Sequence, residues 1–180
     1  MSEIVQCYRF VTKDLRSQNG DMQWVVGEWK KVEGKLSLCN VGLHACRTPY
    51  QSLAHVFGDR WFVAEARGVV VEEGDKFCAS EMRLVKEIPV SVIHQYTVDC
   101  AYHVLPIYEK EYPDDKRPRL ALEAKQAWIN DPSDENKRKL DAAWAARAAA
   151  WAARAAAWDA EIEWQKQHLE ELIKEATNVE

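Results

Sequence analysis

The 180-residue sequence has few of the residues that interrupt regular structure, and it lacks long apolar runs. Glycine occurs seven times and proline six times, whereas hydrophobic residues make up 47% of the chain and charged residues 29%. This composition excludes a largely disordered chain and a fibrous repeat. No stretch approaches the roughly 18 consecutive apolar residues of a membrane span. The length suffices for one domain with a buried core, or for two small ones.

The chain has no excess of basic residues. The 24 Lys and Arg residues stand against 29 Asp and Glu residues, for a net charge of -5. Binders of nucleic acid or of anionic membranes depend on excess positive charge, so the composition excludes both as general functions. The composition does not exclude a local basic patch. The first twenty residues have neither the basic start nor the apolar core of a secretory signal. We therefore expect a cytoplasmic protein, in the host cytosol if a phage encodes it.

The cysteines do not form a disulfide pattern, and the common catalytic loops are missing. Five widely spaced cysteines favour reduced thiols. The groups Cys39, His44, Cys46 and Cys78 are candidate zinc ligands, but no Cys-x-x-Cys pair anchors them. We expect buried thiols, no bound metal and no cofactor. The chain also lacks a glycine-rich phosphate loop, a nucleophile elbow and a metalloprotease helix motif.

The composition changes near residue 100. Short runs of Val, Ile, Phe, Tyr and Trp, separated by Gly and Asp, precede this point, and Ala, Glu, Lys, Leu and Arg dominate after it. We therefore expect an α+β fold with two domains. Residues 1–97 would form a small mixed or antiparallel sheet with a short helix, and residues 98–180 an all-helical domain.

Alternating and continuous apolar runs predict the strands of the first domain. The predicted strands cover residues 5–11, 23–29, 36–39, 61–66 continuing through a bend or bulge at Gly68 to 69–71, and 82–85 running into 90–96. Thr48 followed by Pro49 is typical of a helix start, and predicts a short helix over 49–57 that packs against the sheet.

Capping residues divide the second half into helices. Apolar spacing predicts a buried helix over 98–108. Asp115, with Pro118 in the first turn, predicts the start of a helix that runs to about residue 129. Ser133 or Asp131 would cap a last, long helix that ends near residue 175.

The long helix contains an unusual repeat of tryptophan and alanine. Trp144, Trp151 and Trp158 are seven residues apart in the repeated sequence AWAARAA, so they fall on one line of an α-helix. One interpretation is that they are core residues, or the packing seam that joins copies of the chain into a homo-oligomer. The other is a binding surface in which the indoles act together with Arg147 and Arg154.

Three residues of the first domain suggest an enzymatic alternative. Arg9 lies on the first predicted strand, His44 in a Gly-Leu-His turn, and Glu81 in a Ser-Glu-x-Arg strand. This order of elements resembles ADP-ribosyltransferase-like folds. The resemblance implies an enzyme that uses NAD, in which Glu81 holds the ribose and stabilises an oxocarbenium-like transition state. The Ser-Thr-Ser element of those enzymes is not present in this chain.

Two further resemblances rest on local motifs. The motifs Tyr8-Arg9-Phe10, Gly42-Leu43-His44-Ala45-Cys46, Pro49 and Gly74-Asp75-Lys76-Phe77-Cys78-Ala79-Ser80-Glu81-Met82-Arg83 lie within residues of about 5–95. This segment resembles an uncharacterised domain of phage and bacterial mobile-element proteins, which implies a context but no activity.

The second motif lies in the helical half. The pattern Asp114-Asp115-x-Arg117-Pro118-Arg119 is followed by Ala121, Glu123-Ala124, Trp128 and an Ala-Trp-Arg helix. Over residues of about 98–165 the chain is similar to the fifth class of immunity proteins in bacterial polymorphic-toxin systems. That resemblance implies a protein that binds and neutralises a toxin.

We therefore expect a non-enzymatic phage or mobile-element protein. It would neutralise a bacterial toxin, a defence protein or a nucleotide defence signal by occupying or sequestering it. A protein partner would contact the Trp surface, whereas a nucleotide would need converging Arg and aromatic groups in a concave pocket. A structural homodimer without a ligand is a further alternative. The candidate binding residues are Arg117, Arg119, Trp144, Arg147, Trp151, Arg154 and Trp158.

Overall fold

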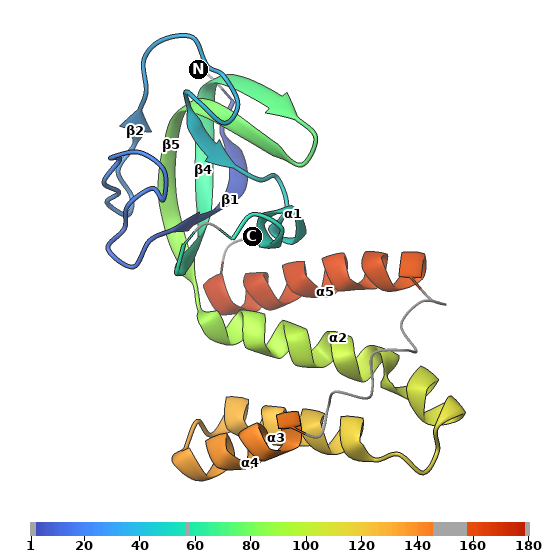
Figure 1. Ribbon diagram of the computed structural model, residues 1–180. Coiled ribbons are helices and arrows are strands. Elements are labelled where there is room, and N and C mark those ends of the chain that lie inside the picture. The colour runs from blue at the N-terminus through green and yellow to red at the C-terminus, as the bar shows by residue number, and fades with distance from the viewer. Residues whose placement is uncertain (1–2, 57, 146–157, 179–180) are drawn as a thin grey trace. The chain divides into compact units, whose positions relative to one another are not determined.

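The computed structural model describes residues 3–56, 58–145 and 158–178 and has two compact units (Figure 1). The first unit comprises residues 1–90 together with 169–180, and the second comprises residues 91–168. The first is built on an antiparallel sheet with a short helix and the second is helical. The predicted α+β fold is therefore confirmed.

The sheet of the first unit consists of five antiparallel strands. They are β1 (Val5–Val11), β2 (Lys30–Lys31), β3 (Leu43–Ala45), β4 (Arg60–Glu73) and β5 (Lys76–Ile88). The order is β1-β4-β5-β2, and β3 also pairs with β5. The prediction for residues 5–11 is confirmed residue for residue.

The sheet curls until its two ends meet. Tyr8 of β1 exchanges backbone hydrogen bonds with Cys46, directly after β3, at N···O distances of 2.9 and 3.0 Å. Side chains on one face of the curled sheet form the core, joined by Trp24 from a loop. The buried core cluster consists of Cys7, Val11, Trp24, Leu43, Ala45, Phe62, Ala64, Ala66, Phe77, Ala79, Met82 and Leu84.

The predicted bulge at Gly68 is also confirmed. The register of β4 against β5 shifts between Arg67 and Val70, so that β4 has an extra residue there. Gly68 has a φ of +85°, and a Cβ atom at this position would lie 2.2 Å from the Ser80 hydroxyl oxygen. That hydroxyl instead accepts a hydrogen bond from the backbone N–H of Val69 (2.9 Å). Glycine is therefore required by both conformation and space.

The strands predicted at residues 23–29 and 36–39 are wrong. Positive φ angles at Gly27 (+87°) and Cys39 (+62°) turn the chain in both segments. Val25 and Val26 are consequently exposed. Gly27 donates one backbone hydrogen bond to Leu84 of β5 (2.8 Å), but the strands that pair with β5 on this side come from the next segments along the chain, β2 and β3.

The last strand of the sheet begins earlier and ends earlier than predicted. β5 already begins at Lys76, and the chain leaves the sheet at Pro89, which has no N–H to donate to a ladder. Residues 90–96, predicted as its continuation, form the first turns of helix α2 (Val90–Glu111). In this helix Val98 and Leu105 are seven residues apart and both are buried, as a helical period requires.

Helix α1 (Pro49–Leu53) begins at the predicted residue but is shorter than predicted. The Thr48 hydroxyl accepts a hydrogen bond from the Gln51 backbone N–H, and the Gln51 side chain accepts one from the Thr48 N–H, which completes a capping box. Ser52 of this helix accepts a hydrogen bond from the Trp61 indole (3.0 Å). The contact fastens α1 to the sheet face opposite the core cluster.

The helical unit contains α2, α3 (Arg117–Asn130), α4 (Asp134–Ala145) and the first part of α5 (Trp158–Thr177). Both predicted helix starts are confirmed. Asp115 accepts a hydrogen bond from the Arg117 N–H (3.1 Å), and Ser133 accepts one from the Asn136 N–H (3.4 Å). None of the helices in the described ranges has the length and apolar character that crossing a membrane requires.

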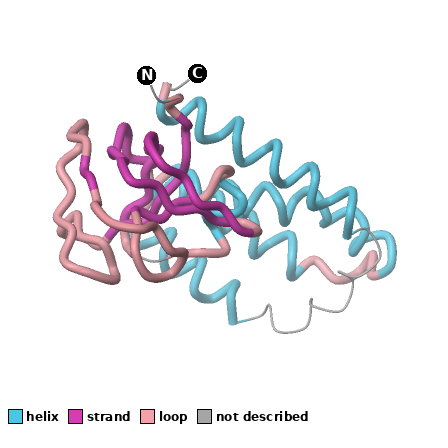
Figure 2. The backbone as a smooth tube through the Cα atoms, turned by 90° about the horizontal axis from the view of Figure 1, so that it is seen from above, coloured by secondary structure: helices cyan, strands magenta, loops and turns pink. Residues whose placement is uncertain are grey.

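Helix α2 lies between the two other helical layers of this unit. Figure 1 shows α3 and α4 side by side, and Figure 2 shows all the described helices in cyan. Gln95 of α2 and Gln126 of α3 exchange amide hydrogen bonds of 3.0 Å. Trp164 of α5 stacks on His103 of α2 with 3.9 Å between ring centroids. An amide pair thus connects α2 with α3, and an aromatic stack connects α2 with α5.

The structure does not test the single long helix predicted from residue 133 to residue 175, because part of this segment lies outside the described residues. The chain is helical up to Ala145 and again from Trp158. Trp151, Arg147 and Arg154 lie outside the description, as do the side chains of Trp144 and Trp158. The predicted Trp line and its homo-oligomer therefore stay predictions.

Candidate functional site

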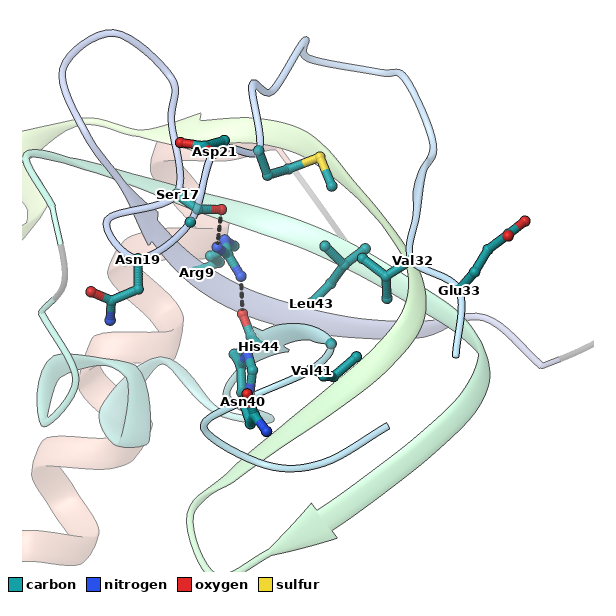
Figure 3. Close-up of a pocket in the computed structure, with 13 residues that line it drawn as sticks. Arg9, Ser17, Asn19, Asp21, Val32, Glu33, Asn40, Val41, Leu43 and His44 are labelled. Carbon is teal, nitrogen blue, oxygen red and sulfur yellow. Dashed lines mark hydrogen bonds between the residues drawn. The ribbon is translucent and has the colours of Figure 1, made fainter. Parts of the chain in front are cut away.

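A pocket opens in the first unit beside β1 and β3 (Figure 3). Its volume is about 400 Å³, which is in the range of small-molecule sites. Strands contribute its inner wall and loops contribute its mouth. We call it the Arg9 pocket; it is lined by Arg9, Ser17, Asn19, Gly20, Asp21, Met22, Val32, Glu33, Asn40, Val41, Gly42, Leu43 and His44.

Arg9 lies at the centre of this pocket. Figure 3 shows its guanidinium between Ser17 and His44. One terminal nitrogen donates to the Ser17 hydroxyl (2.7 Å) and the other to the His44 carbonyl oxygen. The guanidinium also lies over the Trp24 ring, 4.7 Å from its centroid, and the Trp24 indole donates to the same Ser17 hydroxyl (3.0 Å).

The charge of Arg9 has no acidic partner among the described residues. Its Nε atom is buried and makes no hydrogen bond there. Burial lowers the pKa of Arg9 to about 10, because removal from water disfavours the charged form. Asp21 and Glu33, which also line the pocket, are exposed to solvent.

His44 forms a second polar wall of the pocket. Its Nε2 atom accepts a hydrogen bond from the backbone N–H of Cys39 (2.9 Å), so the ring is neutral with the proton on Nδ1. Burial, followed by the positive charge of Arg9, lowers the pKa of His44. This ring acts as an acceptor within the loop rather than as a cation.

The three residues of the enzymatic alternative are only partly brought together. Arg9 and His44 share the pocket, whereas Glu81 does not line it. The Glu81 carboxylate instead accepts a hydrogen bond from Arg67 Nε (2.7 Å). Arg67 lies over the Trp29 ring, 3.9 Å from its centroid.

The candidate zinc ligands occupy different environments. Cys46 and Cys78 are buried, whereas Cys39 is exposed. Burial raises the pKa of Cys46 to about 11 and also raises the pKa of Cys78, so both thiols are protonated at neutral pH. Within the part of the chain that the structure describes, no three His, Cys, Asp or Glu side chains gather as a metal site would require.

The second candidate site is the connection between α2 and α3. We call residues 107–120 the α2–α3 corner. Asp115 is its central acceptor: Arg117 donates to both carboxylate oxygens from Nε and Nη2 (2.8 and 2.7 Å), and the Tyr108 hydroxyl donates to one of them (2.8 Å). These hydrogen bonds hold the pKa of Asp115 well below its usual range and stabilise its negative charge.

Arg119 of α3 is held in a similar way by a carboxylate of α2. It donates from Nε and Nη2 to the two carboxylate oxygens of Glu109 (2.7 and 2.6 Å). The side chains of Arg117 and Arg119 remain 53% and 42% exposed. Exposed apolar groups accompany them at Ile107, Tyr112 and Leu120. The corner therefore presents fixed guanidinium groups beside exposed apolar side chains.

Sequence reasoning singled out Arg9, His44, Arg117 and Arg119, but not the groups that hold them. It missed Ser17 and Trp24, because their contacts depend on the course of an irregular loop with a positive φ at Leu15 (+58°). No periodic pattern marks such a loop. The pairing of Glu109 with Arg119 likewise depends on the conformation of the connection between α2 and α3.

Comparison with family models agrees with the two resemblances. A model described as "Domain of unknown function (DUF7666)" matches residues 5–95, and one described as "Imm-5 like putative immunity protein" matches residues 83–158. The second match covers the α2–α3 corner and is consistent with toxin neutralisation in general. Comparisons with curated proteins and with solved structures give no match. Because the first model spans half of the chain, the chain belongs to the DUF7666 family.

Proposed function

We propose that this chain is a non-enzymatic immunity protein that neutralises a bacterial toxin by binding it at the α2–α3 corner. The observation that carries the proposal is the Asp115 network, which fixes exposed groups within the segment that matches the immunity family. The proposal places the protein in the cytosol of a bacterium, or of the host if a phage encodes it.

The composition of the corner supports contact with a protein. Tyrosine and arginine dominate the energetics of protein interfaces. Tyr112 and Arg117 are both exposed, and Leu120 adds an apolar side chain that is 58% exposed. An apolar surface next to charge-assisted donors is what the centre of an interface requires.

The hydrogen bonds within the corner also lower the cost of association. Immobilising a long side chain at an interface costs about 0.5–1.5 kcal/mol. Asp115 and Glu109 already hold the two arginines by two hydrogen bonds each. Arg117 has five N–H donors, so it keeps donors for the acceptors of a toxin while its position is fixed.

A growth-rescue experiment tests the proposal. A panel of toxin domains from polymorphic-toxin systems is expressed in a sensitive bacterium with and without this chain. We expect the chain to restore growth against at least one toxin and to co-elute with it. The double variant Tyr112→Ala/Arg117→Ala should weaken that complex at least about 100-fold, because hot-spot truncations typically cost 2 kcal/mol or more.

Arg138→Ala is the matched control. Arg138 is an exposed arginine of the same unit that lies outside the corner, on α4. It should leave rescue and complex formation unchanged. Equal loss in the control and the double variant would contradict the assignment to the corner, and toxicity that persists across the whole panel would contradict the immunity role.

A further inference from the structure

Arg9 differs in what its Nε atom contacts from the six described arginines that pair with a carboxylate. Six arginines direct Nε, or the edge formed by Nε and Nη2, at a carboxylate. They are Arg47, Arg60, Arg67, Arg83, Arg117 and Arg119. Arg9 makes no ion pair with any described residue, and its buried Nε has no acceptor.

The remaining donors of Arg9 need an acceptor. A guanidinium has five N–H groups, and the protein accepts from two of them, at Ser17 and His44. The Trp24 face compensates part of the charge, but it accepts no in-plane hydrogen bond. An unpaired buried cation is costly, and an anion at hydrogen-bonding distance removes most of that cost.

The cavity beside the guanidinium has room for a ligand that carries such an anion. Its volume of about 400 Å³ exceeds the volume of a carboxylate or phosphate group alone. Apolar side chains, Val32, Val41 and Leu43, line one part of it. The exposed carboxylates of Asp21 and Glu33 are at the mouth, where solvent screens them.

From this geometry we propose that the Arg9 pocket binds a small molecule through its carboxylate or phosphate group, with the guanidinium of Arg9 as the principal contact. The apolar wall would hold the carbon skeleton of the ligand. The proposal uses no residue of the α2–α3 corner, so it stands or falls independently of toxin binding.

Nuclear magnetic resonance of the full chain tests the proposal directly. The Arg9 Nε–H resonance is assigned by its loss in the Arg9→Lys variant. Sodium phosphate and sodium acetate are then titrated separately, against sodium chloride at equal ionic strength. We expect at least one of the two anions to shift this resonance in a saturable manner, and the stronger of the two identifies the preferred group.

Variants separate the contribution of Arg9 from general charge effects. Arg9→Lys keeps the charge but loses the planar fork, and should weaken binding at least tenfold as judged by the loop amides of Gly20 and Gly42. Arg47→Lys is the matched control, since Arg47 is a part-buried arginine of the same unit that pairs with Glu72 outside the pocket. It should leave the titration unchanged.

Two substitutions at the mouth keep the test valid if Arg9 variants do not fold. Asn19 is exposed and lines the pocket. Asn19→Lys should tighten anion binding about two- to threefold and Asn19→Asp should weaken it by a similar factor, as expected for a unit charge nearby in water. The proposal is overturned if neither anion gives a saturable shift at about 100 mM, well above the millimolar range of weak single-group contacts. It is also overturned if both Asn19 variants bind equally.

Discussion

Replacement of Trp61 by alanine is expected to lower the free energy of unfolding by about 3–5 kcal/mol, the typical cost of truncating a buried tryptophan. Trp61 is 2% exposed. Its ring stacks on Phe10 with 5.3 Å between centroids and 2° between planes, and its indole donates to Ser52 of α1. The substitution therefore removes a buried stack and the polar contact that fastens α1 to the sheet. Urea unfolding followed by circular dichroism measures the change.

Two further variants separate the parts of this effect. Trp61→Phe keeps an aromatic ring but leaves the Ser52 hydroxyl without its donor, so it should cost distinctly less than the alanine variant. Trp29 is the matched control, because it is a part-exposed tryptophan whose ring contacts Arg67 on the sheet surface. Trp29→Ala should cost about 1 kcal/mol. Equal losses for Trp29→Ala and Trp61→Ala would contradict the assignment of Trp61 to the interior.

The parts of the fold that the sequence predicts are those with short-range causes. Alternation of Tyr8 and Phe10 with core residues identifies β1, and the capping box at Thr48 identifies the start of α1. Gly68 marks the bulge, since glycine adopts the positive φ found there without strain. Each of these signals acts within a few residues of the chain.

The failures have long-range causes. Val25 and Val26 have high strand propensity, yet the turn at Gly27 leaves them exposed while Trp24 enters the core. The curl of the sheet determines which segment reaches β5, and the sequence predicts neither the curl nor the loop that takes Trp24 to Arg9. The sequence therefore identifies the strand residues Arg9 and His44 as candidates for a site, but not the loop residues that complete the Arg9 pocket.

Replacement of Asp115 by alanine is expected to release the α2–α3 corner. Its carboxylate accepts hydrogen bonds from the Arg117 side chain, the Arg117 backbone and the Tyr108 hydroxyl. Loss of this acceptor frees the Arg117 side chain and leaves the backbone N–H of the first residue of α3 without its partner, which loosens the first turn. Limited trypsin digestion should cleave the Lys116–Arg117 bond at least about threefold faster, since cleavage requires local opening. Toxin protection should fall with it.

Asp114→Ala is the matched control, because Asp114 is an exposed neighbour of the same charge that takes no part in the hydrogen bonds centred on Asp115. It should digest like the original chain.

The pH dependence of the corner gives a second criterion. Since Arg117 and Tyr108 lower the pKa of Asp115, the stabilisation it provides is present above its ordinary value and is lost as the pH falls below about 4. The near-ultraviolet circular dichroism of the tyrosines should therefore change in this acidic range in the original chain and in Asp114→Ala, and less in Asp115→Ala. Identical profiles in all three proteins would show that Asp115 does not hold the corner, and the toxin surface would then have to be sought elsewhere in the helical unit.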